Sequence, residues 1–127
     1  MRRALILIIT LTLLSFGAGA YLDDLQHDTA ARYLTQLNHL RALLLTEDFS
    51  KAQLEQAHIH ALWQHDERWL KCMVSHHHTR AVSEALLKLA TALEQRWADE
   101  ALLALDEAAS ALLDVQHGYL PTLSNVL

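Results

Sequence analysis

ALILIITLTLLSFGAGAYL, residues 4–22, is a run of nineteen residues without a charged side chain. As an α-helix it would be roughly 28 Å long, which is close to the thickness of the hydrocarbon core of a bilayer. Two arginines precede this run and two aspartates follow it. We therefore divide the chain into an N-terminal membrane anchor, residues 1–22, and a second domain, residues 23–127.

The flanking charges predict how the anchor is oriented. Basic residues beside a membrane helix stay in the cytoplasm, so Arg2 and Arg3 predict a cytoplasmic N-terminus and a second domain outside the cell. Tyr21 lies where an aromatic residue of the membrane interface is expected. The alternative is a signal peptide, because Ala18-Gly19-Ala20 has the small-x-small form that signal peptidase cleaves. Cleavage after Ala20 would release a secreted domain.

The rest of the chain shows the apolar period of amphipathic helices. No helix breaker separates the anchor from the first apolar stripe, so both can belong to one long helix. The residues expected on the buried faces are Leu22, Leu25, Ala30, Tyr33, Leu37, Leu40 and Leu44 in the first stripe, Leu54, Ile59, Leu62, Trp63, Trp69, Leu70 and Met73 in the second, Val82, Ala85, Leu86, Leu89 and Leu93 in the third, and Leu102, Leu105, Ala109, Leu112 and Val115 in the fourth.

Short segments with capping residues separate these stripes. Ser50 and Gln53 have the spacing of a capping box, and Ser75 is a suitable N-cap for the third helix. Short connections favour antiparallel neighbours. We therefore predict an all-α fold, with one transmembrane helix followed by an antiparallel helical bundle of about four helices. The connections and helix ends are expected at residues 46–49, at residues 95–97 with Asp99 and Glu100 in the next first turn, and at Gly118 and Pro121.

Composition excludes several classes of protein. Three glycines and one proline are too few for the turns of an all-β fold. Without Arg2 and Arg3 the chain has eight basic and fifteen acidic side chains, a net charge of −7, which argues against nucleic acid as a partner. Cys72 is the only cysteine, so no intrachain disulfide can form. Its thiol is either buried in a helix interface or available for an intermolecular bond, and we expect burial, as is usual for free cysteines.

Large and small apolar residues raise the question of a partner surface. Trp63, Trp69 and Trp97 could bind a partner or the membrane surface, but in so short a chain we expect them to fill the core. Alanines are abundant in the fourth stripe and could offer a shallow surface to a partner helix. Exposure to solvent is the simpler interpretation at most of these alanines, which are Ala98, Ala101, Ala104, Ala108, Ala109 and Ala111.

Nine histidines suggest a metal site or a response to mild acid. His58 and His65 are seven residues apart and would share a helix face, and His76 begins a run of three histidines. None of these pairs has the spacing of a zinc protease motif. We therefore keep His58, His65 and His76 as weak metal-ligand candidates, and surface or capping roles as the simpler interpretation.

The sequence contains no recognisable catalytic group and no cofactor motif. No serine lies in a Gly-x-Ser-x-Gly elbow, and glycine-rich phosphate loops are absent. Asp66 and Glu67 lie near His65 and two tryptophans, where a carboxyl group beside indoles could act as an acid. No second carboxylate is placed to work with it. We therefore expect one carboxylate in solvent, tryptophans in the core, and no enzymatic activity.

Several short motifs resemble the family of unknown function numbered 4363, whose members are small bacterial proteins, mainly of Firmicutes, with an N-terminal transmembrane helix. Residues 47–52, EDFSKA, resemble the acidic-aromatic-x-Lys-Ala start of a helix in that family, and Leu123 to Leu127 resemble its ending. Trp63 and Trp69 resemble its paired tryptophans, and His76 lies where a family histidine follows. The sequence departs at His77, His78 and Arg80, where the family has acidic residues. The resemblance implies a location and a fold but no activity.

Together these features predict a non-enzymatic, membrane-anchored helical module outside the cell. Residues 4–22 would contact the membrane, and the second domain would bind another protein or a second copy of the chain. The alternative function is a histidine-based metal-binding or pH-sensing protein outside the cell.

Overall fold

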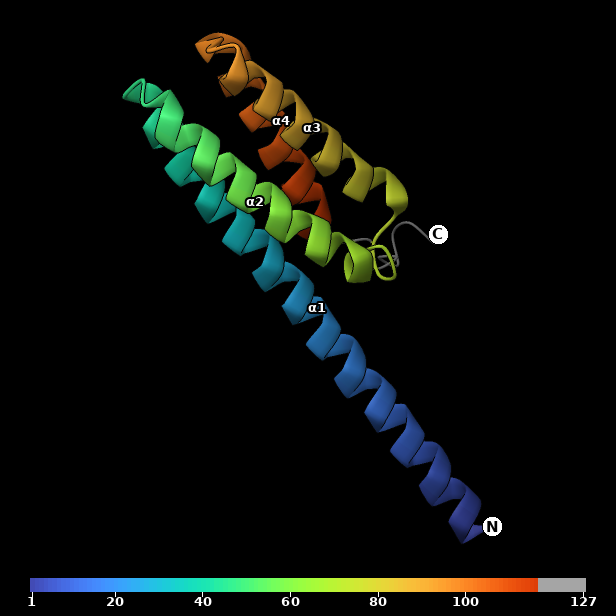
Figure 1. Ribbon diagram of the computed structural model, residues 1–127. Coiled ribbons are helices and arrows are strands. Elements are labelled where there is room, and N and C mark those ends of the chain that lie inside the picture. Colours follow the sequence, from blue (N-terminus) through green and yellow to red (C-terminus); the bar gives the residue numbers. More distant parts are fainter. Residues whose placement is uncertain (117–127) are drawn as a thin grey trace.

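The computed structural model describes residues 1–116, and every regular element in this part of the chain is an α-helix (Figure 1). This confirms the predicted all-α fold. The expected helix stop at Gly118 and Pro121 lies outside the described residues. The helices are α1 (Arg2–Leu45), α2 (Phe49–Leu70), α3 (His76–Glu94) and α4 (Ala98–Gln116).

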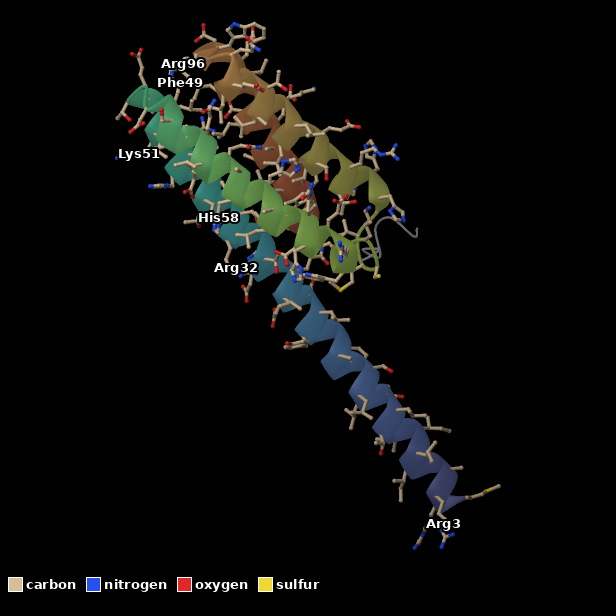
Figure 2. The ribbon with its side chains drawn as sticks, in the orientation of Figure 1. Arg3, Arg32, Phe49, Lys51, His58 and Arg96 are labelled. Carbon is tan, nitrogen blue, oxygen red and sulfur yellow. The ribbon has the colours of Figure 1, made fainter. Side chains whose placement is uncertain are left out.

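Helix α1 is unbroken over its 44 residues and joins the anchor segment to the bundle. Its first half projects from the bundle, with Arg3 at the far end of the molecule from Phe49 and Arg96 (Figure 2). The large apolar side chains between Leu5 and Phe16 are 50–79% exposed. The first buried side chain is that of Gln26, one turn after the predicted boundary at residue 22. The helix therefore has two halves with opposite surroundings.

The second half of α1 forms a four-helix bundle with α2, α3 and α4. Helix α1 packs against α2 and α4, and α3 packs against the same two helices, so the four form a closed ring around one core. The connections are short and successive helices run antiparallel, as predicted. All five residues predicted for the buried face of α3 are buried. The other large, fully buried side chains are Leu37, Leu40, Ile59, Trp63, Leu70, Leu105, Leu112 and Val115.

The two turns farthest from the anchor share one geometry. Glu47 and Arg96 both have φ of 58°, in the left-handed region. At each turn two amides bond back to the end of the preceding helix: Glu47 N–H and Asp48 N–H donate to Leu44 and Leu43 at 3.0 Å each. At the other turn, the N–H groups of Arg96 and Trp97 donate to the carbonyls of Leu93 and Ala92 at 3.1 and 2.9 Å. This tight helix ending decides where the next helix begins.

The predicted capping box at Ser50 is wrong, because the turn at Glu47 lets α2 begin before Ser50. Asp48 is the N-cap of α2, and its side chain accepts a hydrogen bond from Lys51 N–H at 3.2 Å. Gln53 instead reaches across to α3, where its side-chain amide donates to the carbonyl oxygen of Leu93 at 3.2 Å. The other predicted cap is confirmed: Ser75 Oγ accepts from His77 N–H at 3.2 Å and begins α3.

Three leucines predicted to be buried are exposed, namely Leu22, Leu54 and Leu62. The buried face of α2 contains Ala52, Ile59 and Trp63, and Leu54 is about 140° away from Ile59 around the helix. Gln56 occupies a buried position that the apolar pattern did not predict, and its side-chain amide donates to the carbonyl oxygen of Leu86 at 2.9 Å. An amide can occupy a core position when it is satisfied in this way.

The alanines of α4 lie mainly inside the bundle, so neither a partner surface nor exposure to solvent holds at most positions. Ala101, Ala104, Ala108 and Ala111 are at most 7% exposed. Side chains this small allow neighbouring helices to approach closely, and α4 has extensive contacts with both α3 and α1. The alanine face of α4 is therefore part of the core of the bundle.

Leu89 on α3 and Leu54 on α2 offer a matched test of this packing. Leu89 is fully buried, whereas Leu54 is 74% exposed. Leu89→Ala should lower the free energy of unfolding by about 2–5 kcal/mol because it leaves a cavity in the core. Leu54→Ala should change it by less than about 0.5 kcal/mol. Chemical denaturation of the full chain in mild detergent, followed by circular dichroism, measures both. Equal losses would contradict this packing.

Candidate functional site

The carboxylate that the sequence singled out, Asp66, is held by two aromatic side chains. Tyr33 Oη on α1 donates to Asp66 Oδ2 at 2.6 Å, and Trp69 Nε1 donates to Asp66 Oδ1 at 3.2 Å. Both carboxylate oxygens therefore have a donor. Burial raises the pKa of Tyr33 well above its usual value, and the hydrogen bond to the Asp66 carboxylate raises it further. The phenol is thus held in its neutral, hydrogen-bond-donating form.

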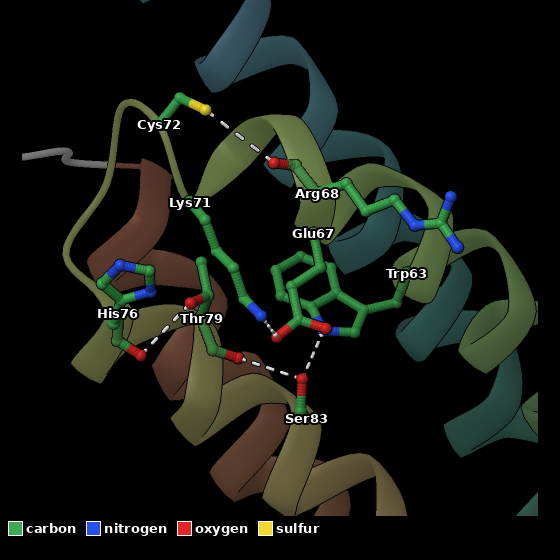
Figure 3. A network of polar contacts seen from close by, with 8 residues as sticks. All are labelled: Trp63, Glu67, Arg68, Lys71, Cys72, His76, Thr79 and Ser83. Atoms are coloured by element: carbon green, nitrogen blue, oxygen red, sulfur yellow. Dashed lines mark hydrogen bonds and ion pairs between the residues drawn. The ribbon is translucent and has the colours of Figure 1, made fainter.

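Trp63 links this pair to α3. Its ring is fully buried and meets Tyr33 edge to face, with 5.4 Å between centroids. Its Nε1 donates to Ser83 Oγ at 2.8 Å, and Ser83 Oγ in turn donates to the carbonyl oxygen of Thr79 at 3.2 Å (Figure 3). Every polar atom in this chain of contacts has a partner. The arrangement holds α1, α2 and α3 in register.

The side chains around this network take separate roles. Glu67 pairs with Lys71 Nζ at 3.4 Å, and His65 is exposed. Cys72 is also exposed, which corrects the prediction of a buried thiol; its Sγ lies 3.9 Å from the carbonyl oxygen of Arg68 (Figure 3). The short α2–α3 connection carries Cys72 out of the helix interface. Asp66 therefore joins α1 to α2, whereas the ion pair of Glu67 with Lys71 lies within the C-terminal end of α2.

The three histidines kept as metal candidates are exposed and are divided between two helices. His58 and His65 are on α2, and His76 begins α3. Within residues 1–116 no three histidine, cysteine or acidic side chains are grouped closely enough to hold one metal ion. His39 Nδ1 lies 3.8 Å from Glu55 Oε1 and joins α1 to α2. The described histidines are thus distributed over the surface of the bundle.

An apolar groove lies between α3 and α4 on the outer face of the bundle. We call it the α3–α4 groove, and the residues that matter to its chemistry are Leu87, Lys88, Trp97, Glu100, Leu103 and Glu107. The three apolar members are more than half exposed: Leu87 56%, Trp97 54% and Leu103 62%. The expectation that Trp97 fills the core is therefore wrong. The left-handed turn at Arg96 is followed by the start of α4 at Ala98, and it leaves the indole of Trp97 outside the core.

Charges at the rim of the groove are divided between its two helices. The basic rim residue, Lys88, is on α3, and the acidic rim residues, Glu100 and Glu107, are on α4. Lys88 Nζ pairs with Glu107 Oε2 at 3.2 Å, and both side chains remain largely exposed. Glu100 has no ion-pair partner among residues 1–116. A partner would therefore meet a basic edge on one side and an acidic edge on the other.

Sequence reasoning missed most of this groove, although one signal was present. Leu87 and Leu103 lie outside the buried faces predicted for their helices, so each is a leucine on a face that should be polar. Single exposed leucines are ordinary, but a cluster with an exposed tryptophan is a feature of binding surfaces. Their proximity follows from the way α3 and α4 pair, which the period of either helix alone does not contain.

Comparison with known families gives one match. The model of the family described as Domain of unknown function (DUF4363) matches residues 22–126, which is most of the chain. No curated protein and no solved structure matches this chain.

The raised pKa of Tyr33 gives a prediction about alkaline pH. Above about pH 10 an unfolded chain loses the phenolic proton while the folded chain keeps it, so stability should fall as pH rises, by up to about 1.4 kcal/mol per unit. Tyr33→Phe should remove this part of the loss and lower stability at neutral pH by about 1–2 kcal/mol. Denaturation between pH 7 and 11 measures both effects.

Tyr21→Phe is the matched control, because Tyr21 is 67% exposed on the same helix. It should follow the unsubstituted chain at every pH. If Tyr33→Phe also lost stability above pH 10 as steeply as the unsubstituted chain, the role given to Tyr33 would be wrong.

Proposed function

The chain belongs to the DUF4363 family, and on that premise we propose that it is a single-pass membrane protein whose helical bundle lies outside the cell and binds another protein without catalysing a reaction. The observation that carries the proposal is α1 itself. One continuous helix has a first half with no protein around it and a second half that forms a wall of the bundle.

The exposed half of α1 has the chemistry of a membrane helix. Within residues 1–116 it contains a window that is long and apolar enough to cross a bilayer, and none of that window is buried by the rest of the protein. Two of its polar side chains are satisfied within the helix: the Thr10 and Thr12 hydroxyls each donate to the carbonyl four residues earlier at 2.8 Å. Hydroxyls bonded in this way can enter hydrocarbon at low cost. A signal peptide before cleavage has similar chemistry, so the mature chain must be measured.

Charge at the two ends of the apolar run supports the orientation. Arg2 and Arg3 lie at its start, whereas Asp23 and Asp24 follow it and lead into a domain of net charge −7. The excess of arginine on one side favours a cytoplasmic N-terminus. The bundle would then face the outside, with its base close to the membrane surface.

The described part of the bundle offers a candidate binding surface. The α3–α4 groove exposes Leu87, Trp97 and Leu103, and tryptophan is enriched at the centre of protein interfaces. The carboxylate network around Asp66 is used to hold helices together. These features support an interaction module.

Protease treatment of intact cells tests the location. A chain with a C-terminal tag should remain in the membrane fraction, keep its full mass apart from its initiator methionine, and lose the tag to protease added outside. An N-terminal tag should be protected in the same cells. The expected result follows from an anchor that is retained with its arginines inside.

A variant with Ala18→Leu and Ala20→Leu is the matched control for cleavage. These changes remove the small residues that signal peptidase requires and leave the run apolar. If the unsubstituted chain were instead a soluble product beginning at Tyr21, and the variant stayed in the membrane, the domain would be secreted and the anchored reading would be wrong.

A further inference from the structure

We propose that the partner of the α3–α4 groove is the same groove of a second copy of this chain, anchored in the same membrane. The proposal rests on the function proposed above and names the partner. It is carried by the division of charge across the groove and by the constraint that the anchor places on how two copies can meet.

The anchor limits two copies to a parallel arrangement. Both bundles stand on the same face of the membrane at the same height, so a twofold axis between them must run along the membrane normal. Helix α3 lies nearly along α1, as the bundle requires (Figure 1). When two such grooves face each other, α3 of one copy therefore meets α4 of the other at equal heights. Such an interface is isologous, because each patch is used twice.

The rim charges fit this arrangement. Lys88 on α3 and Glu107 on α4 lie at one height, because they already pair across the groove at 3.2 Å within one chain. The twofold axis brings Lys88 of each copy toward Glu107 of the other, so the ion pair is repeated between chains. Glu100 adds to the acidic edge and has no ion pair among residues 1–116. A partner with one sign of charge would match only one edge, whereas a second copy matches both.

The apolar residues and the anchor together supply the attraction. Leu87, Trp97 and Leu103 would be covered by the same three residues of the partner, removing exposed apolar surface from water. Confinement to one membrane raises the effective concentration of one copy around another, so a small interface suffices. The groove thus has complementary charge, an apolar centre and a tether that keeps copies in the required orientation.

Charge-reversing substitutions in two differently tagged full-length chains test the proposal. In cell membranes that are crosslinked before they are dissolved in mild detergent, unsubstituted chains should co-purify, because crosslinking records contacts made while both copies are still confined to one membrane; an uncrosslinked portion of each sample is kept. Lys88→Glu with itself, and Glu107→Lys with itself, should co-purify several-fold less, because like charges meet at both rims. Lys88→Glu with Glu107→Lys should recover, because opposite charges meet again at both rims. Leu103→Asn should abolish co-purification with any copy.

Folding and anchoring are measured in the same samples, by thermal unfolding and membrane fractionation. The charged side chains are exposed, so the single variants should unfold within a few degrees of the unsubstituted chain. A chain that is anchored and folded but does not co-purify with itself would overturn self-association and leave the proposed interaction function standing. A chain released from the membrane would overturn both.

The membrane segment provides the remaining outcome. A Cβ added at Gly19 meets no atom of this chain within 4 Å, so Gly19→Leu should fold normally. We expect Gly19→Leu to co-purify with itself as the unsubstituted chain does. Loss of co-purification in Gly19→Leu, with both charge variants unaffected, would mean that the copies meet through their anchors, and would overturn the role of the α3–α4 groove.

Discussion

The structure depends on one helix serving two different surroundings. Through residue 24 every side chain of α1 is exposed and residues 4–22 carry no charge, whereas from Gln26 onward only one stripe of the helix faces the core. The change from exposed to one-sided packing occurs within one turn of α1. It needs no break in the helix, because only the side chains differ between the two parts and the helical backbone is the same. Gln26 fixes the junction: its side-chain amide donates at 2.6 Å to the carbonyl oxygen of Val115, an acceptor at the end of α4. The anchor is thereby joined to the last described helix as well as to the next one.

Polar contacts inside the bundle then select one arrangement of the helices. Apolar stripes alone permit helices to slide or rotate against one another at small cost. Gln56 bonded to Leu86, Trp63 bonded to Ser83 and Tyr33 bonded to Asp66 each require one register, since a shift by a turn would leave a buried polar group without a partner. The Asp66 carboxylate, which accepts hydrogen bonds from Tyr33 and Trp69, thereby joins α1 to α2.

The sequence predicted well what depends on spacing along one helix and poorly what depends on the turns. The long apolar N-terminal helix, the four helical segments, the Ser75 cap and the whole buried face of α3 follow from period and composition. The prediction that Leu54 and Leu62 are buried is wrong because it followed the general preference of leucine for a core. The side of α2 that faces the core is set by Ala52, Ile59 and Trp63. The start of α2 depends on a left-handed turn at Glu47, and the exposure of Trp97 depends on one at Arg96. Neither turn has a glycine at that position that would have indicated it in the sequence. Contacts between helices, such as Tyr33 with Asp66, lie beyond any local pattern.

The same turn geometry and the alanines of α4 explain why the groove exists. Ala101, Ala104 and Ala108 let α4 lie deep against its neighbours, which leaves little room in the core for the larger residues of its sequence. Trp97 comes before the helix has turned inward, and Leu103 falls between two buried alanine positions on the opposite phase, so both remain outside. A sequence under pressure only to stay monomeric in water would place polar residues at such sites, because an exposed apolar cluster invites association. Trp97 and Leu103 are exposed beside two charged edges that complement the same edges of a second copy. The proposed contact between two copies requires this combination.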